Sequence, residues 1–266
     1  MILFELFKTK PKITETILEE NIDEDIHIFG NNSNITNLQK MKNLKRLYIT
    51  NIKTHDFEKL CRLNLNLEML YIYNFHIENL SPLENFKSIQ YFLFDWNNKN
   101  TNLFNFENFR NLKGLYINDF KRLNSIKNIS NIKTLKYFLL SGGIWNKVSI
   151  DTLEPISKLN NLIYLHLSNI SVKFDGLTPL SNLTNLEELS VSNQFETKDY
   201  AMLAAKLVNT KCSSFSPYIE LGHKIGEHDI MIVGKKKPFL NSIKDKSRIE
   251  KYEIEFNNLK KGFIAK

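Results

Sequence analysis

Apolar residues recur along most of the chain with a spacing that mixes turn and strand periods. Residues 177–193 read LTPLSNLTNLEELSVSN, and their apolar side chains are separated by three, three, three and two positions. The positions are Leu180, Leu183, Leu186, Leu189 and Val191, and Asn193 follows. A spacing of three suits a tight turn, and a spacing of two suits a strand with one buried side. The segment therefore predicts a turn that leads into a short strand and ends at a polar corner.

This unit recurs at a nearly constant period. The motif L-x-x-L-x-[LI] begins at Leu44, Leu67, Ile89, Leu112, Leu135, Leu162 and Leu186. The steps between these starts are 23, 22, 23, 23, 27 and 24 residues. Seven residues after each start stand Asn51, Asn74, Trp96, Asp119, Gly142, Asn169 and Asn193. One strand and one return per unit of about 20–29 residues is typical of leucine-rich repeats.

Two of the units carry a closer resemblance. Residues 153–169 and 177–193 resemble the short-repeat, internalin-like bacterial class of the leucine-rich repeat family, with Pro155 and Pro179 where that class has proline. The resemblance covers about residues 32–195. It implies an α/β solenoid, a leucine-rich repeat horseshoe with a parallel sheet on its concave face. Secreted internalins carry export signals and surface anchors; this sequence shows neither pattern, so their location is not expected here.

The spacing also predicts which side chains meet. Motif positions 0, +3 and +5 should point inward and stack on the same positions of neighbouring units, because no single unit can bury its own core. The Asn at +7 is expected to bond backbone groups of an adjacent turn at a buried corner. Returns this short should be extended or 3₁₀ rather than fully α-helical, and the apolar pattern is loosest before Leu67.

The pattern divides the chain into three units. Residues 1–31 are expected to form an N-terminal cap with a degenerate first repeat at Ile26-x-Ile28, and residues 32–195 the solenoid. Residues 13–28 hold six carboxylates and no Lys or Arg, which favours a solvated cap over a cation site.

Residues 196–266 are expected to form an α+β cap that closes the open end of the solenoid. We predict a helix over 197–207 with Thr197 as N-cap, strands over 215–221 and 229–233, and a second helix around 249–259. The predicted capping side chains are Leu203, Leu207, Phe215, Ile219, Ile230 and Ile232.

Composition is that of an ordered protein. The 266 residues are 42% hydrophobic and 24% charged, with nine Gly and six Pro. Cys61 and Cys212 lie far apart, which favours free thiols over a disulfide scaffold. At the N-terminus, MILFELFKTK, the lysines follow the apolar run, whereas a secretory signal has the reverse order, and no run approaches a membrane-spanning length. A cytoplasmic location is the expectation.

Tyrosine is concentrated on the predicted concave face, which comprises strand positions +2, +4 and +6. Seven of the ten tyrosines fall on these 21 positions, where fewer than one would fall by chance. Either the tyrosines stack on one another to stabilise the sheet, or they bind a partner, since aromatic residues concentrate in interfaces. The binding hypothesis names Tyr48, Tyr71, Tyr73, Tyr91, Leu93, Asp95, Tyr116, Tyr137, Tyr164 and His166, with Trp96 and Trp145 at the rim.

The two tryptophans leave two interpretations open. Both follow strand ends, and Trp145 lies in the segment GGIWNKVSI, which lengthens one unit to 27 residues. Each either plugs a corner that lacks Asn or is an exposed anchor for a partner.

Catalytic signatures are absent from the sequence. It contains no HExxH, paired CxxC, GxSxG or GxxxxGK[ST] motif. His223, His228 and Asp229 are interpreted as a hairpin turn rather than a metal site. His166 has no nucleophile or orienting carboxylate in its own repeat. We therefore expect no enzyme activity, cofactor or metal.

Charge is concentrated at the C-terminal end. Residues 197–266 hold 14 Lys or Arg and 8 Asp or Glu, so that +6 of the net charge of +7 lies there. The favoured interpretation is a non-catalytic, monomeric protein-interaction module that binds a protein through its concave face, as a scaffold, regulatory subunit or immunity-type inhibitor. The alternative is binding of nucleic acid or an acidic surface through Lys235–Lys237 and Lys260–Lys261. No membrane partner is expected.

Overall fold

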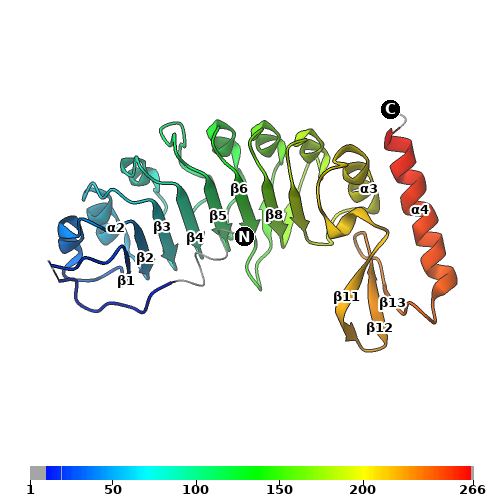
Figure 1. The fold of residues 1–266 in the computed structure, drawn as a ribbon, viewed down its shortest axis with the longest axis horizontal. Coiled ribbons are helices and arrows are strands. Elements are labelled where there is room, and N and C mark those ends of the chain that lie inside the picture. Colours follow the sequence, from blue (N-terminus) through cyan, green and yellow to red (C-terminus); the bar gives the residue numbers. More distant parts are fainter. Residues whose placement is uncertain (1–9, 19, 265–266) are drawn as a thin grey trace.

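The computed structural model describes residues 10–18 and 20–264, so residues 1–9 of the predicted N-terminal unit lie outside the described residues. Eight short strands form one parallel sheet in chain order (Figure 1). They are β1 (Asp25–Phe29), β2 (Arg46–Thr50), β3 (Met69–Tyr73), β4 (Tyr91–Asp95), β5 (Gly114–Asn118), β6 (Tyr137–Ser141), β8 (Tyr164–Ser168) and β10 (Glu188–Val191). The seven predicted strands are confirmed, and β1 is the strand of the degenerate first repeat.

Short helices return the chain from one strand to the next, except between β4 and β5, where the described residues form no helix. Most are 3₁₀ helices, as predicted: η1 (Ile35–Lys40), η2 (Ser81–Asn85), η3 (Lys127–Asn131), η4 (Glu154–Lys158) and η5 (Thr178–Asn182). The return before Leu67 instead contains an α-helix, α2 (Thr54–Cys61), in the unit where the apolar pattern is loosest. After β6 and β8 the chain adds a two-stranded parallel sheet of β7 (Val148–Ile150) and β9 (Ile170–Val172).

The inward side chains of the sheet form the core of the solenoid. Positions 0, +3 and +5 of all seven units are buried, as predicted, and their stacking continues through Ile26 and Ile28 of β1. Around β4 the core is aromatic, where Phe92 and Phe94 stack with ring centroids 5.1 Å apart. Each fully buried side chain of this kind contributes about 1.5–3 kcal/mol, so the repeat is stabilised by contacts between units rather than within them.

The backbone conformation explains why Asn is common at the corner after each strand. Asn51, Asn74 and Asn169 have positive φ angles of 59°, 56° and 47°. Asn tolerates this left-handed region better than most residues. The predicted side-chain bond to a neighbouring turn exists at Asn169, whose amide donates to the Gly143 carbonyl at 2.6 Å. At Asn51 the prediction of a buried corner is wrong, because this side chain is exposed.

The C-terminal unit has the predicted helix and hairpin with shifted bounds. It contains α3 (Thr197–Lys206), η6 (Ser213–Phe215), β11 (Tyr218–Ile225), β12 (His228–Ile232), β13 (Phe239–Leu240) and α4 (Lys246–Ile264). The predicted N-cap is wrong: Glu196 occupies the cap, and Thr197 is the first helical residue. The Thr197 hydroxyl donates to the Val233 carbonyl at 3.0 Å, which ties α3 to the end of the hairpin.

This unit packs on the open end of the solenoid. Tyr200, Leu203 and Leu207 belong to the same buried core as Leu186 and Leu189 of the last repeat. Ile230 and Ile232, also predicted to cover that end, instead pack with Leu240 and Ile249 between the hairpin and α4. Their assignment is corrected because β12 turns these side chains toward α4. Among the helices of the described residues, none combines the length and the apolar character needed to cross a membrane.

Candidate functional site

Three rows of outward side chains cross the concave face. Because the strands pair in register, side chains at the same motif position lie side by side on neighbouring strands. The middle row runs through His27, Tyr48, Tyr71, Leu93, Tyr116, Leu139, His166 and Ser190. Such direct neighbours across strands are close enough for their side chains to pack. The parallel register therefore brings the predicted tyrosines together.

The tyrosines pack into two apolar clusters on this face. Tyr48, Met69, Tyr71 and Leu93 are buried, with Tyr73, Tyr91 and Tyr116 packed against them. A second cluster holds buried Leu139 and Tyr164, with Tyr91, Tyr116 and Tyr137 around them. Tyr48 and Leu93 are almost fully covered, so at these two positions the stacking interpretation is favoured. Tyr73, Tyr91, Tyr116 and Tyr137 are half-buried and keep accessible surface.

Asp95 is the acidic centre of this surface. The Asn118 amide donates to its carboxylate at 2.8 Å, and the Tyr71 hydroxyl also donates to it. Burial raises the pKa of Asp95, and these two hydrogen bonds act in the opposite direction. Burial also raises the pKa of the Tyr71 and Tyr116 hydroxyls, so both hydroxyls resist ionisation even in mildly alkaline solution.

The N-terminal end of the face carries polar contacts that the sequence patterns did not identify. The Arg46 guanidinium donates two hydrogen bonds to Asp25, at 2.5 and 2.6 Å. His27 is buried; its Nδ1 donates to the Pro11 carbonyl at 3.1 Å, and its Nε2 lies 2.9 Å from the Thr50 hydroxyl. The only available signal was the register of Ile26-x-Ile28, which places Asp25 and His27 on the outward side of β1. Part of the predicted solvated acidic run is thus paired with β2.

His166 has a partner from the next repeat. Its Nδ1 lies 2.9 Å from the Ser190 hydroxyl, and burial lowers the pKa of its ring. Ser190 also bonds to the Tyr164 hydroxyl. Nearby, a cavity of about 430 Å³ is lined by residues that include Tyr137 and Glu188. Within residues 10–18 and 20–264, no carboxylate hydrogen-bonds to the His166 ring, so the pair lacks the orienting acid of a catalytic triad.

Trp96 stands at the strand-end rim of the concave face. Its backbone has a φ angle of +62°, and its side chain is 41% exposed. The indole ring packs against Tyr73 and His76, each with a centroid distance of 6.0 Å. A bulky side chain in the left-handed region costs about 1–2 kcal/mol, and most equivalent corners have Asn or Asp there. Trp96 thus occupies a corner whose backbone conformation favours Asn or Asp over a bulky residue.

Trp145 is an exposed tip rather than a corner plug. Ile144 and Trp145 are 89% and 92% exposed. The loop that carries them is closely fixed: a Cβ on Gly142 would lie 2.3 Å from the Asn169 carbonyl oxygen, and one on Gly143 would lie 2.3 Å from the Asp119 carboxyl group. Asn169 also bonds this loop through the Gly143 carbonyl. Ile144 was missed, although it adjoins Trp145 in the same inserted segment.

The architecture now determines the fold type. Parallel strands recur with short 3₁₀ returns, and their inward Leu, Ile and Phe side chains build one continuous core. The fold is a leucine-rich repeat solenoid. No protein-family model and no curated protein matches the sequence.

Several solved structures are similar to the leucine-rich repeat array. An internalin (inlF) from Listeria monocytogenes strain 4b F2365 is 19% identical over 70% of this chain and 59% of that chain, with a TM-score of 0.49. Internalin C2 of the same strain is 22% identical over 66% and 63%, with a TM-score of 0.39. TLR13, solved in complex with ssRNA13, is 16% identical over 70% and 32%, with a TM-score of 0.49. The match spans less than two thirds of each of these proteins.

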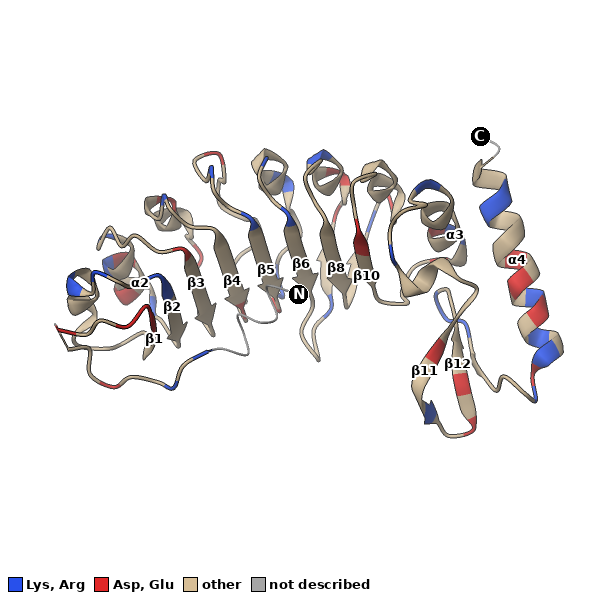
Figure 2. Cartoon of the chain, viewed as in Figure 1, with Lys and Arg blue, Asp and Glu red and all other residues tan. Residues whose placement is uncertain are grey.

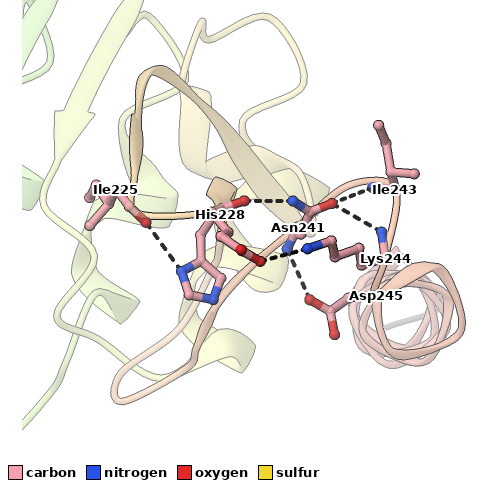
Figure 3. A network of polar contacts seen from close by, with 7 residues as sticks. Ile225, His228, Asn241, Ile243, Lys244 and Asp245 are labelled. Atoms are coloured by element: carbon pink, nitrogen blue, oxygen red, sulfur yellow. Dashed lines mark hydrogen bonds and ion pairs between the residues drawn. The ribbon is translucent and has the colours of Figure 1, made fainter.

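Beyond the leucine-rich repeats, polar contacts fix the turn of the C-terminal hairpin to the segment that leads into α4. Asn241 donates to the Glu227 carbonyl and accepts from the backbone N–H of Ile243 and Lys244, and Lys244 pairs with the Glu227 carboxylate (Figure 3). The His228 ring bonds to the Ile225 carbonyl at 3.2 Å. In the described part of the chain, no group of three His, Cys, Asp or Glu side chains is placed to hold a metal ion.

The basic C-terminal surface is partly neutralised by its own acids. Lys237 pairs with Glu255 at 3.1 Å and lies over the Tyr252 ring at 4.8 Å. Arg248 pairs with Asp245. Figure 2 shows acidic and basic residues interspersed along α4. These pairs are already counted in the net charge of +6, and they leave fewer than the 14 Lys and Arg side chains of this unit free to meet a phosphate backbone.

Proposed function

We propose that this leucine-rich repeat protein is a non-catalytic interaction module that binds a protein partner through its concave face. One observation carries the proposal: the concave face holds half-buried tyrosines, one of which, Tyr73, packs against the exposed Trp96, and the loop after β6 presents the exposed Trp145. Large aromatic residues supply most of the binding energy in protein interfaces. Proteins with this fold generally act as interaction modules, and their concave surfaces serve for binding.

The rim supports the proposal further. Trp96 has an unfavourable left-handed backbone, and such outliers persist where function requires them. The tip at Ile144 and Trp145 is held by close glycine contacts and by Asn169. Because the loop backbone is already fixed, binding has to order little more than the two exposed side chains, and less conformational entropy is lost than with a mobile loop.

The proposal includes no chemical step. Ser190 and His166 are hydrogen-bonded, but the pair serves here as a polar patch of the binding surface. By binding its partner, the protein would act as a scaffold, a regulatory subunit or an inhibitor, and it would do so as a monomer. Cys61 and Cys212 are free thiols, which supports a reducing, cytoplasmic setting.

The test compares two exposed aromatic residues on different parts of the surface. The full chain is used to capture its partner from native lysate, and the purified partner is titrated against wild type, Trp145→Ala and Phe174→Ala. Phe174 is 79% exposed and follows β9, outside the eight-stranded sheet, so it is a matched control. We expect Trp145→Ala to weaken the complex by about 2 kcal/mol and Phe174→Ala to leave the affinity unchanged.

Both variants should keep the wild-type melting temperature, because neither side chain is buried. Equal affinities for wild type and Trp145→Ala would reject the rim as part of the interface. A loss of affinity in Phe174→Ala alone would move the interface to the flank formed by β7 and β9.

A further inference from the structure

A lysine from outside the repeats is seated on the concave face. The Nζ atom of Lys10 lies over the Tyr71 ring, 5.2 Å from its centroid. The ammonium group also interacts electrostatically with Asp95, which opposes the lowering of the Lys10 pKa by burial. A cation within about 6 Å of a tyrosine ring is attracted by the negative face of the ring.

The segment that follows Lys10 is fixed to β1. The Pro11 carbonyl accepts from His27, and the Thr14 backbone N–H donates to the His27 carbonyl at 2.7 Å. Ile13 forms a parallel bridge with His27. These contacts fix the backbone of residues 11–14 along the edge of β1, and this places the preceding residue, Lys10, next to Tyr71.

The receiving site is held together by its own hydrogen bonds. The Tyr71 hydroxyl donates to Asp95, and Asn118 donates to the same carboxylate, so the ring and the acid hold each other in place. An aromatic face beside a carboxylate suits an ammonium group, which gains from both the ring and the negative charge. An anionic ligand would be repelled by the same carboxylate.

The charge of the whole face agrees with this chemistry. The outward positions of the eight strands carry three carboxylates, Asp25, Asp95 and Glu188, and one cation, Arg46. Arg46 is bonded to Asp25. With Lys10 seated over Tyr71, the face holds three carboxylates and two cations; without Lys10 the count is three to one, so a site that Lys10 has left would attract a basic group of a partner.

We propose that Tyr71 and Asp95 form a recognition site for a lysine ammonium group presented by a protein partner, and that Lys10 occupies this site in the free protein as a built-in competitor. The inference rests on the proposed function, because it assigns one contact within the proposed interface. A partner lysine has to displace Lys10, so the apparent affinity of the site is its intrinsic affinity multiplied by the fraction of molecules in which Lys10 has left the site.

The experiment follows the Tyr71 ring by NMR in the full-length chain labelled with ¹³C-tyrosine. The probe is the peptide acetyl-TKPQ-amide, which has the sequence of residues 9–12 with Lys12 replaced by Gln, and its matched control without any lysine is acetyl-TQPQ-amide. Both are titrated into wild type, Lys10→Gln, and the double variant Lys10→Gln with Asp95→Asn. Cadaverine serves as a small diamine control.

We expect Lys10→Gln alone to shift the Tyr71 ring signals, because the cation leaves the ring. The lysine peptide should bind Lys10→Gln at least fivefold more tightly than wild type. Replacing the peptide lysine by glutamine, or adding Asp95→Asn, should reduce that affinity at least fivefold.

Equal binding of both peptides, or equal binding to wild type and Lys10→Gln, would overturn the proposal. Cadaverine binding as tightly as the peptide would overturn it as well, because the site would then recognise small amines. These titrations contain no partner, so they are independent of the Trp145→Ala result. If the ammonium site fails while Trp145→Ala weakens the complex, only this inference is lost.

Discussion

The two faces of the eight-stranded sheet are made from alternating residues of the same strands, yet they differ in composition. The inward rows contain only Leu, Ile, Phe and Val, and all of these residues are buried. The outward rows mix Tyr with acids, amides, hydroxyls and two histidines. The inward face has to match the same face of the next repeat, which restricts it to apolar side chains. The outward face is free of this restriction and can carry a binding site.

Burial alone does not separate the two faces. Leu139 and Leu140 are neighbours in β6, point to opposite faces, and are both 0% exposed. Leu140 belongs to the core of the solenoid, whereas Leu139 is covered by tyrosines of the concave face. The difference lies in what covers each residue: the next repeat in one case, and the candidate interface in the other. This contrast can be tested at three levels.

Removal of the C-terminal unit should have the largest effect, and only through the inward face. Deletion of residues 197–266 exposes Leu186, Leu189 and Val191 to water. Covering them removes several hundred Å² of apolar surface, worth several kcal/mol at about 25 cal/mol per Å². Because the whole stability of a domain is about 5–15 kcal/mol, the truncated chain should aggregate or unfold in part. Circular dichroism and size-exclusion chromatography measure this outcome.

A monomeric 1–196 fragment with the wild-type melting temperature would contradict the capping role. The C-terminal unit would then be an independent domain. The inward face of the last repeat would not need to be covered, and the contrast between the two faces would weaken.

Substitutions of Leu139 and Leu140 should affect stability and partner binding differently. Leu140→Ala opens a cavity between repeats and should lower the free energy of unfolding by about 3–5 kcal/mol. Leu139→Ala can be compensated by movement of the surrounding tyrosines, so about 2 kcal/mol or less is expected. Affinity for the captured partner should fall in Leu139→Ala and stay unchanged in the folded fraction of Leu140→Ala. Urea unfolding and partner titration measure the two quantities. Equal stability losses would show that the concave face is simply a second core.

The sequence predicts the inward face better than the outward one, for a physical reason. Stacking of identical positions imposes a period, so Leu44 and its six counterparts identify the strands. The fit is loosest before Leu67, in the return that contains α2, but the pattern did not predict an α-helix there. The outward side chains obey no period. Their type predicts a surface rich in tyrosine, but the burial of Leu93 and the exposure of Trp145 depend on neighbours and on loop shape.

The repeat pattern of the sequence could not predict contacts between segments that are distant along the chain. Lys10 meets Tyr71 only because residues 11–14 follow the edge of β1, and no spacing in the sequence indicates this path. The N-cap at Glu196 was missed for a related reason. The Thr197 hydroxyl, which has the chemistry of a cap, is used instead by the Val233 carbonyl, a tertiary partner.

The smallest expected effect concerns pH and belongs to the outward face, because the inward rows contain no titratable side chain. Burial lowers the pKa of His27, and the nearby Lys10 charge acts in the same direction. The unfolded chain therefore binds a proton more readily than the folded one below a pH of about 6.5, the ordinary value for histidine. The stability that neutral His27 provides is fully present above that pH. It is lost as the pH falls from there through the lower folded pKa.

The variant His27→Gln isolates this effect from other titrating groups. His166 and all carboxylates are common to both proteins, so their contributions cancel in the difference between wild type and variant. Gln retains hydrogen-bonding atoms for the Pro11 carbonyl and the Thr50 hydroxyl, which His27 contacts in the wild type. We expect the difference in unfolding free energy, wild type minus variant, to shrink between pH 7.5 and pH 5. Urea denaturation at four pH values measures it. A difference that stays constant, or that grows in acid, would mean that folding does not suppress protonation of His27.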